Sequence, residues 1–340
     1  MRDRGLTTLC VLALVIAIGL VTPVAVEGQA QTPASKNQTS TSTKTTAAGT
    51  TATTWTQPRT PWGDPDLQGI TWNYATITPF ERPEEFGGKD VLTDDEVAEF
   101  ERQTLERRRA TQQTAGQDWW DPGTKVMPTR QASLVVDPPN GRIPPMTPDA
   151  QKNAATRAKA RRDRGPADSP EVLGLNERCI VGAAAGPPIV PGPFNNDIQF
   201  IQTRDYIVIF TEMIHQARIV PMDGRPHGHV RDWMGDSRGH WEGHTLVVDT
   251  INFTDKTNFR GSGEKLHLVE RFTRVNESSL DYEFTADDPA TWARPWTVRI
   301  PMTKIDGLIY EFACHEGNSR SLEGIFSATR AEEKARVEKR

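Results

Sequence analysis

The sequence predicts a mainly β protein, an antiparallel barrel or sandwich with an N-terminal excursion of two helices. Two observations lead to this fold class. Strand-like segments follow one another closely between about 198 and 315, separated by short turns. Ahead of them, the stretches at about 94–113 and 148–164 carry helix signals instead. We expect no helix between the strands, which argues against a parallel α/β sheet.

The strand-like segments alternate between apolar and polar side chains, as half-buried strands do. In SLDYEFTADD, Leu280, Tyr282 and Phe284 share one face. In HTLVVDTINF, Asp249 falls among apolar neighbours, where a buried carboxylate would need a partner. The predicted strand segments are IQFIQTRDYIVIFTEMIHQARIVP, HTLVVDTINF, KLHLVERFTRV, SLDYEFTADD, WTVRIPMTK and LIYEFACHE.

Helix signals mark two earlier segments. Thr93 to Glu96 has the T-x-x-E form of a capping box, which predicts a helix over 94–113. The second helix opens at Pro148 and is rich in basic residues. We interpret its charge as a solvated helix face, the alternative being a surface for an anionic partner. Its basic residues are Lys152, Arg157, Lys159, Arg161, Arg162 and Arg164.

The N-terminus reads as an export signal over residues 1–30. Arg2 and Arg4 precede an apolar run that ends in small residues. A Thr/Ser-rich spacer, 31–57, follows, and it is too polar to bury a core. The remaining 58–335 form a single β-rich domain. We therefore expect a periplasmic or secreted protein without stable membrane insertion after cleavage.

Charge and cysteine content narrow the function class. The chain carries a formal charge of −5, which makes nucleic acid a poor partner. Of its three cysteines, Cys179 and Cys314 lie outside the leader. In an oxidising compartment they predict one disulfide, and the alternative is a pair of buried free thiols.

Several motifs together resemble a large group of exported bacterial proteins of unknown function. The motifs are PWGDPDLQGITWN with TPFERP, GRIPPMTPDAQ, ERCIVG, MIHQARIVPMDGRPH, GDSRGHWEGHTLVVDTINFTDKTNF and CHEGN. The resemblance covers about 58–335 and implies export and a shared β-rich fold, but no activity. Gly69 and Trp72 also resemble the start of lipocalin-like barrels, although those barrels place one residue between Gly and Trp and this chain places two.

The segment YEFACHEGN carries candidate catalytic residues. If 309–315 is a strand, Cys314 and His315 point to opposite faces, so His315 does not serve Cys314 as a base. His315 then shares a face with Glu311, and Glu316 follows. A histidine beside a carboxylate can act as a general base with its orienting group. The alternative is a hydrogen-bonded cap that closes the barrel.

His215 completes this candidate group. On a strand it would share an apolar face with Met213 and Ala217. It is then a core residue, or the best candidate base if that face lines a cavity. If His267 and His315 also face the interior, the three histidines would converge there.

We expect ligand contacts at a barrel mouth or a groove beside it, where tryptophans and polar side chains gather. The tryptophans in predicted loops or strand ends are Trp62, Trp119, Trp120, Trp233, Trp292 and Trp296. The candidate ligand-binding residues are Arg218, Trp233, Trp241, His267, Arg271 and Asn318.

No metal or cofactor motif is recognisable. Histidines cluster at His227, His229, His240 and His244, but their spacing is loop-like and matches no zinc motif. The chain has no G-x-S-x-G elbow, Walker loop or dinucleotide fingerprint. We therefore expect no metal and no cofactor.

Three functions fit these observations. The first is a protein that binds a small molecule in a β-barrel pocket. The second is a hydrolase or lyase that uses His and Glu as general acid and base. The third is an envelope structural or interaction protein, suggested by the Thr/Ser-rich spacer.

Overall fold

The structure, a computed structural model, describes residues 55–110, 121–164, 172–182 and 185–338. The predicted leader, almost all of the predicted spacer, and Trp119 and Trp120 therefore lie outside the described residues. The third function depended on that spacer, so it stays a prediction. Within the described chain, no helix combines the length and the apolar content needed to cross a membrane.

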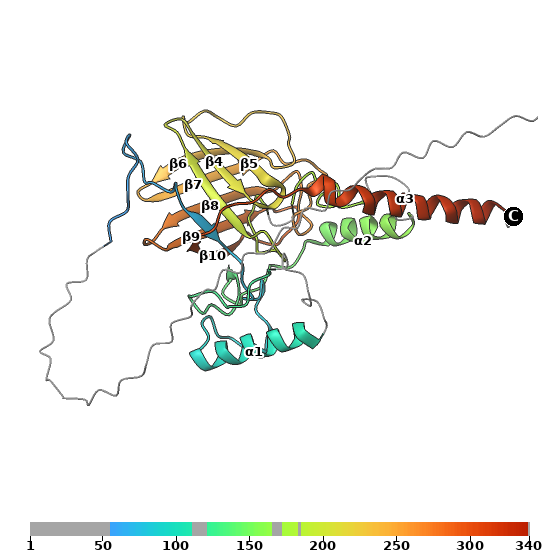
Figure 1. Ribbon diagram of the computed structural model, residues 1–340, viewed down its shortest axis with the longest axis horizontal. Coiled ribbons are helices and arrows are strands. Elements are labelled where there is room, and N and C mark those ends of the chain that lie inside the picture. The colour runs from blue at the N-terminus through green and yellow to red at the C-terminus, as the bar shows by residue number, and fades with distance from the viewer. Residues whose placement is uncertain (1–54, 111–120, 165–171, 183–184, 339–340) are drawn as a thin grey trace, which may run out of the picture. The chain divides into compact units, whose positions relative to one another are not determined.

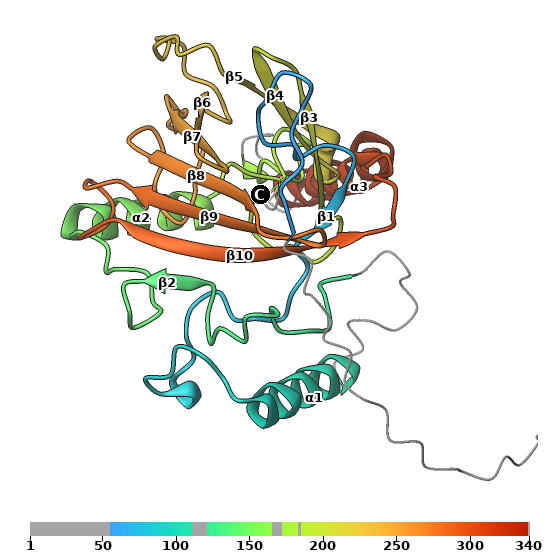
Figure 2. The same ribbon diagram turned by 90° about the vertical axis from the view of Figure 1, so that its left-hand side faces the viewer.

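A ten-stranded antiparallel sheet dominates the fold and confirms the predicted mainly β class (Figures 1 and 2). Its strands are β1 (Thr71–Asn73), β2 (Val135–Asp137), β3 (Asp197–Gln202), β4 (Tyr206–Thr211), β5 (Gln216–Pro221), β6 (Asp236–Glu242), β7 (Thr245–Ile251), β8 (His267–Arg274), β9 (Ser279–Asp287) and β10 (Trp296–Ile305).

Strand order divides the sheet into two runs joined by a short bridge. The order is β5-β4-β3-β1-β10-β9-β8-β7-β6, and β2 pairs with β10 outside this path. The short strand β1 joins the runs, because Trp72 pairs with Ile198 of β3 on one side and Lys304 of β10 on the other.

The sheet is curled, and its two edge strands approach each other. A Cβ atom at Gly239 of β6 would lie 2.8 Å from a side-chain carbon of Val220 on β5, so only glycine fits at this approach. The hydrogen-bonded order nevertheless ends at β5 and β6, which leaves the sheet open between them. The architecture is therefore sandwich-like, with two halves packed across a shared interior.

Large side chains fill the space inside the curl. Leu280, Tyr282 and Phe284 are fully buried on one face of β9, which confirms the predicted alternation. The expectation that Trp292 and Trp296 lie on a surface or rim is wrong. Both indoles are buried with ring centroids 5.3 Å apart, because the interior needs large apolar side chains to reach close packing.

One ion pair crosses this apolar interior. Arg218 of β5 is 5% exposed and Glu270 of β8 is 0% exposed. The guanidinium donates twice to the carboxylate, and its Nη2–Oε1 distance is 3.0 Å. Tyr282 of β9 also donates to Glu270, over 2.8 Å, and accepts from the backbone N–H of Ile189. A buried charge persists only when it is paired and hydrogen-bonded in this way.

The two predicted N-terminal helices are present. Helix α1 (Asp94–Ala110) begins with the predicted capping box, in which the Glu96 carboxylate accepts from Thr93 N–H and Thr93 Oγ1 accepts from Glu96 N–H. Helix α2 (Pro148–Arg162) is capped by Thr147, whose hydroxyl accepts from Ala150 N–H over 3.1 Å.

Three predictions about the strand region are wrong. The segment 309–315 is irregular rather than a strand, and the chain then forms helix α3 (Cys314–Glu338). Strand β10 already pairs with β9, β2 and β1, so the chain leaves the sheet after Ile305. A 3₁₀ turn at Met213–His215 also interrupts the expected strand. The predicted loop with the histidine cluster contains β6, which pairs fully with β7.

Replacing either partner of the buried pair with methionine tests how much the pair contributes to stability. We expect R218M and E270M each to lower the free energy of unfolding by about 3–5 kcal/mol, because each leaves one uncompensated charge in the interior. The double variant should lose less than the sum of the two. Urea unfolding measures all three values, and strict additivity would show that the two groups do not depend on each other.

Candidate functional site

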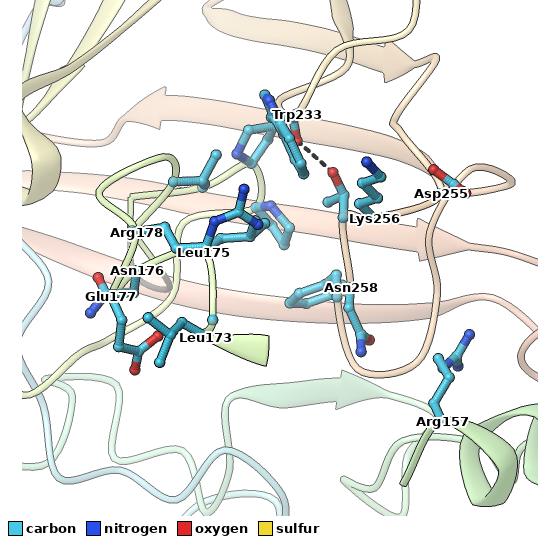
Figure 3. Close-up of a pocket in the computed structure, with 18 of the residues that line it drawn as sticks. Arg157, Leu173, Leu175, Asn176, Glu177, Arg178, Trp233, Asp255, Lys256 and Asn258 are labelled. Atoms are coloured by element: carbon cyan, nitrogen blue, oxygen red, sulfur yellow. Dashed lines mark hydrogen bonds between the residues drawn. The ribbon is translucent and has the colours of Figure 1, made fainter. Parts of the chain in front are cut away.

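A cavity of about 620 Å³ opens among the loops beside the sheet (Figure 3). Its walls come from segments that are far apart in the chain. One wall is the stretch 172–182 and the other is the loop 255–259, and Trp233 and Arg157 of α2 also line the cavity. Pro187 and Pro188 complete the lining.

The first wall is tied to α3 by the predicted disulfide. Cys179 is bonded to Cys314, and the two Cα atoms are 5.9 Å apart. The pairing is confirmed, although Cys314 begins a helix and not a last strand. The bond fixes the middle of the wall to a distant part of the chain.

Further contacts anchor the same wall. The amide of Asn318 donates to the Glu177 carbonyl over 2.9 Å. Gly182 lies against the 3₁₀ turn so closely that a Cβ atom there would stand 2.4 Å from Met213 Cγ. Ile214 and Cys314 join Met213 in a small apolar cluster separate from the main core. The wall is therefore supported from outside the cavity.

The second wall is held by hydroxyl groups and by ring stacking. Thr257 Oγ1 donates to the Trp233 carbonyl over 2.9 Å, the hydrogen bond drawn in Figure 3. Thr254 Oγ1 accepts from Thr257 N–H and so closes the loop. Phe259 stacks on the buried Trp296 at a centroid distance of 5.8 Å. The 255–259 loop thus holds the backbone of Trp233 in place.

A second arrangement with chemical potential is a pair of carboxyl groups at the end of the β3–β4 hairpin. Glu212 is 6% exposed and Asp197 is half-buried. Asn73 donates to Asp197 and Asn195 donates to Glu212, each over 2.8 Å. The backbone also joins the pair, because Glu212 N–H donates to the Asp197 carbonyl.

The two acids each affect the pKa of the other. Burial raises the pKa of Glu212 to about 7, and the neighbouring Asp197 adds to the rise. Burial also raises the pKa of Asp197, while hydrogen bonds from Asn73 and Glu212 work against that rise. The hydrogen bond between the two acids raises the pKa of Glu212 and works against the rise at Asp197, which favours Glu212 as the protonated partner. A protonated acid beside a carboxylate near neutral pH is suited to proton transfer.

The structure places the four predicted catalytic residues on the surface. His215, Glu311, His315 and Glu316 are all exposed, and no hydrogen bond or ion pair joins any two of them in the described chain. His215 lies in the 3₁₀ turn, where its Nδ1 donates to the Phe312 carbonyl over 3.1 Å. It therefore contacts the segment that bears Glu311, and the catalytic assignment stays a prediction.

The six predicted ligand-binding residues are scattered. Trp233 lines the cavity, and Asn318 holds the cavity wall from behind. Arg218 is occupied by Glu270 in the interior. Trp241 packs against the main core. On the outer face, Arg271 pairs with Glu242 over 2.7 Å, and His267 pairs with Asp249.

Asp249 pairs with two histidines, as expected for a carboxylate that lies among apolar neighbours. Nε2 of His267 donates to one carboxylate oxygen over 2.6 Å, and Nε2 of His227 donates to the other over 2.8 Å. Their hydrogen bonds outweigh the effect of burial and lower the pKa of Asp249. The idea that three histidines converge inside the strands is wrong, because His215, His267 and His315 are all exposed. Among the residues that the structure describes, no group of three or more His, Cys, Asp or Glu side chains is arranged to hold a metal ion.

Sequence reasoning missed the carboxyl pair, although the sequence contains a signal for it. Ile198 pairs with Thr211 in the hairpin, so the next positions outward are Asp197 and Glu212. Two acids that flank the open end of a hairpin meet there, but our prediction takes 198–221 as one strand segment and places no turn at Thr203–Asp205. The cavity has no such signal, because its walls meet only in the folded chain.

Comparison of the chain with protein-family models, with curated proteins and with solved structures finds no match.

The carboxyl pair should make stability depend on pH. Glu212 binds its proton more tightly in the folded state than in the unfolded state, where its pKa is about 4.5. Its contribution is therefore fully present below about pH 4.5 and is lost as the pH rises toward about 7. E212Q stays neutral and still donates to Asp197. We expect it to lose less stability than wild type between pH 5 and pH 7.5 in urea unfolding, and parallel losses would contradict the shared proton.

Removal of the disulfide should loosen the first wall. The bridge spans 135 residues, and the chain-entropy model gives it about 5 kcal/mol of stabilisation. We expect C179A/C314A to lose up to that amount and to be cleaved faster within 172–182 by limited proteolysis under native conditions. Cleavage at wild-type rates would show that Gly182 and Asn318 alone hold the wall.

Proposed function

We propose that this protein binds a small molecule in the cavity between the 172–182 wall and the 255–259 loop. A volume of about 620 Å³ falls within the range of drug-sized and cofactor-sized sites. The observation that carries the proposal is that both walls are anchored from outside, the first by the disulfide to Cys314 and the second by Thr254 and the buried Trp296. A preformed site loses less entropy on binding than a mobile one.

The cavity lies among the loops because the space within the strands is occupied. Phe272 and Tyr282 stack at a centroid distance of 4.7 Å, and Arg218 reaches Glu270 across the same space. The proposed ligand therefore sits beside the curled sheet. We also propose that the fold is barrel-like, of the lipocalin-like kind, and that the protein is periplasmic or secreted. The disulfide supports the location, because such bonds persist in oxidising compartments.

A second candidate function is acid–base catalysis at the carboxyl pair, in a hydrolase or lyase. The observation that favours it is the raised pKa of Glu212, about 7, beside a half-buried Asp197. Glu212 would donate a proton and Asp197 would accept one. His215, three residues further along and exposed, would then stand at the edge of this group.

Native mass spectrometry of the full chain purified from its own host tests the binding proposal. We expect the folded protein to carry extra mass that is lost on denaturation, and W233A to carry much less of it. Trp241 packs against the main core and does not line the cavity, so W241F serves as the matched control and should retain the mass. If wild type carries no extra mass, and no compound of a ligand library raises its Tm, the binding proposal is wrong.

A further inference from the structure

We infer that the ligand of this cavity is an anion with an apolar body, such as an aromatic or aliphatic carboxylate or sulfonate. The inference rests on the proposed function and goes beyond it, because it names the chemical class of the ligand. It follows from the charges and the apolar side chains that line the cavity together.

Three cationic side chains from three separate segments line the cavity. Arg157 comes from α2, Arg178 from the first wall and Lys256 from the second (Figure 3). Arg157 donates to the Gly261 carbonyl over 3.3 Å, so it is seated on the loop that continues the second wall. Neither Arg178 nor Lys256 has an ion-pair partner among the described residues. Both are free to pair with a bound anion.

The carboxylates in the lining do not neutralise these cations. Glu177 and Asp255 also line the cavity, but among the described residues neither forms an ion pair with Arg157, Arg178 or Lys256. In Figure 3 they lie at opposite margins of the pocket, with Arg178 and Lys256 between them. An anion placed in the centre would therefore meet the cations first. Charge-assisted hydrogen bonds to such an anion are about twice as strong as neutral ones.

The rest of the lining is apolar and would hold the body of the ligand. Trp233, Phe259 and Leu175 are each half-buried, so their side chains still present surface to the cavity. An aromatic or aliphatic group would bury this surface and gain about 25 cal/mol per Å² removed from water. A purely polar anion such as inorganic phosphate would leave it exposed.

Helix α2, whose basic residues stand out in the sequence, would attract an anionic ligand to the cavity. Helix α2 carries Arg157 into the cavity lining, and further exposed cations lie along its length. Asp163 pairs with one of them, Lys159, over 3.9 Å. A positive surface within a Debye length of a site raises the local concentration of anions. The helix would thus attract the ligand that the cavity retains.

A pair of fluorescent probes that differ by one charged group tests the inference. 8-Anilino-1-naphthalenesulfonate is anionic, and N-phenyl-1-naphthylamine has the same rings without the sulfonate. We expect the full chain to bind the sulfonate about tenfold more tightly, which corresponds to one net charge-assisted hydrogen bond. R178Q/K256Q should remove this preference and leave the affinity for the neutral probe unchanged. The control R204Q/K304Q changes two exposed cations outside the cavity and should retain it.

The outcomes separate the two levels of the proposal. W233A should weaken both probes, because it removes apolar lining that both share. If both probes bind equally and R178Q/K256Q changes neither, the anionic class is overturned while the cavity still binds. If neither probe binds, or W233A binds both as wild type does, the cavity is not a binding site and the proposed function is overturned with the inference.

Discussion

The Arg218–Glu270 pair is the interaction on which the curl of the sheet depends. It joins an edge strand, β5, to β8 across the interior, and Tyr282 of β9 extends the same network. No ladder of hydrogen bonds closes the sheet between its described edge strands β5 and β6. Interior contacts must therefore hold the two halves together, and this pair is a polar one among the apolar contacts of the core. Its cost is the desolvation of two charges, which the bidentate geometry and the tyrosine offset.

The turn at Met213–His215 lies between the two candidate sites. On one side it begins directly after Glu212, whose carboxyl shares a proton with Asp197. On its other side, Gly182 of the cavity wall packs against Met213 with no room for a side chain. The small apolar cluster around Cys314 joins both. The cavity wall and the carboxyl pair are therefore supported by the same short turn.

Local patterns predicted the parts of the fold that depend on neighbouring residues. Alternation identified β9 and β8, and the capping box at Thr93 located the start of α1. A count of cysteines was enough to predict the disulfide. The same reasoning failed at 309–315, because a short alternating stretch has the same pattern whether or not a partner strand is free to receive it. Of the cavity lining, the sequence singled out Trp233 and, on the basic helix, Arg157. It did not indicate a cavity, because the two walls come from segments that are far apart in the chain.

A barrel-like protein that binds a ligand in its interior sets selectivity with the side chains of its strands. Here those positions serve the fold, because Glu270 and Tyr282 are fully buried and bonded to each other. In the proposed function, recognition falls to side chains on loops and on α2, which lie outside the main core. Arg178 and Lys256 lie outside the main core, so the charge preference that we propose for the cavity can vary independently of the fold. The buried ion pair thus belongs to the part of the chain that maintains the fold, and the cations of the loops belong to the part that we propose binds the ligand.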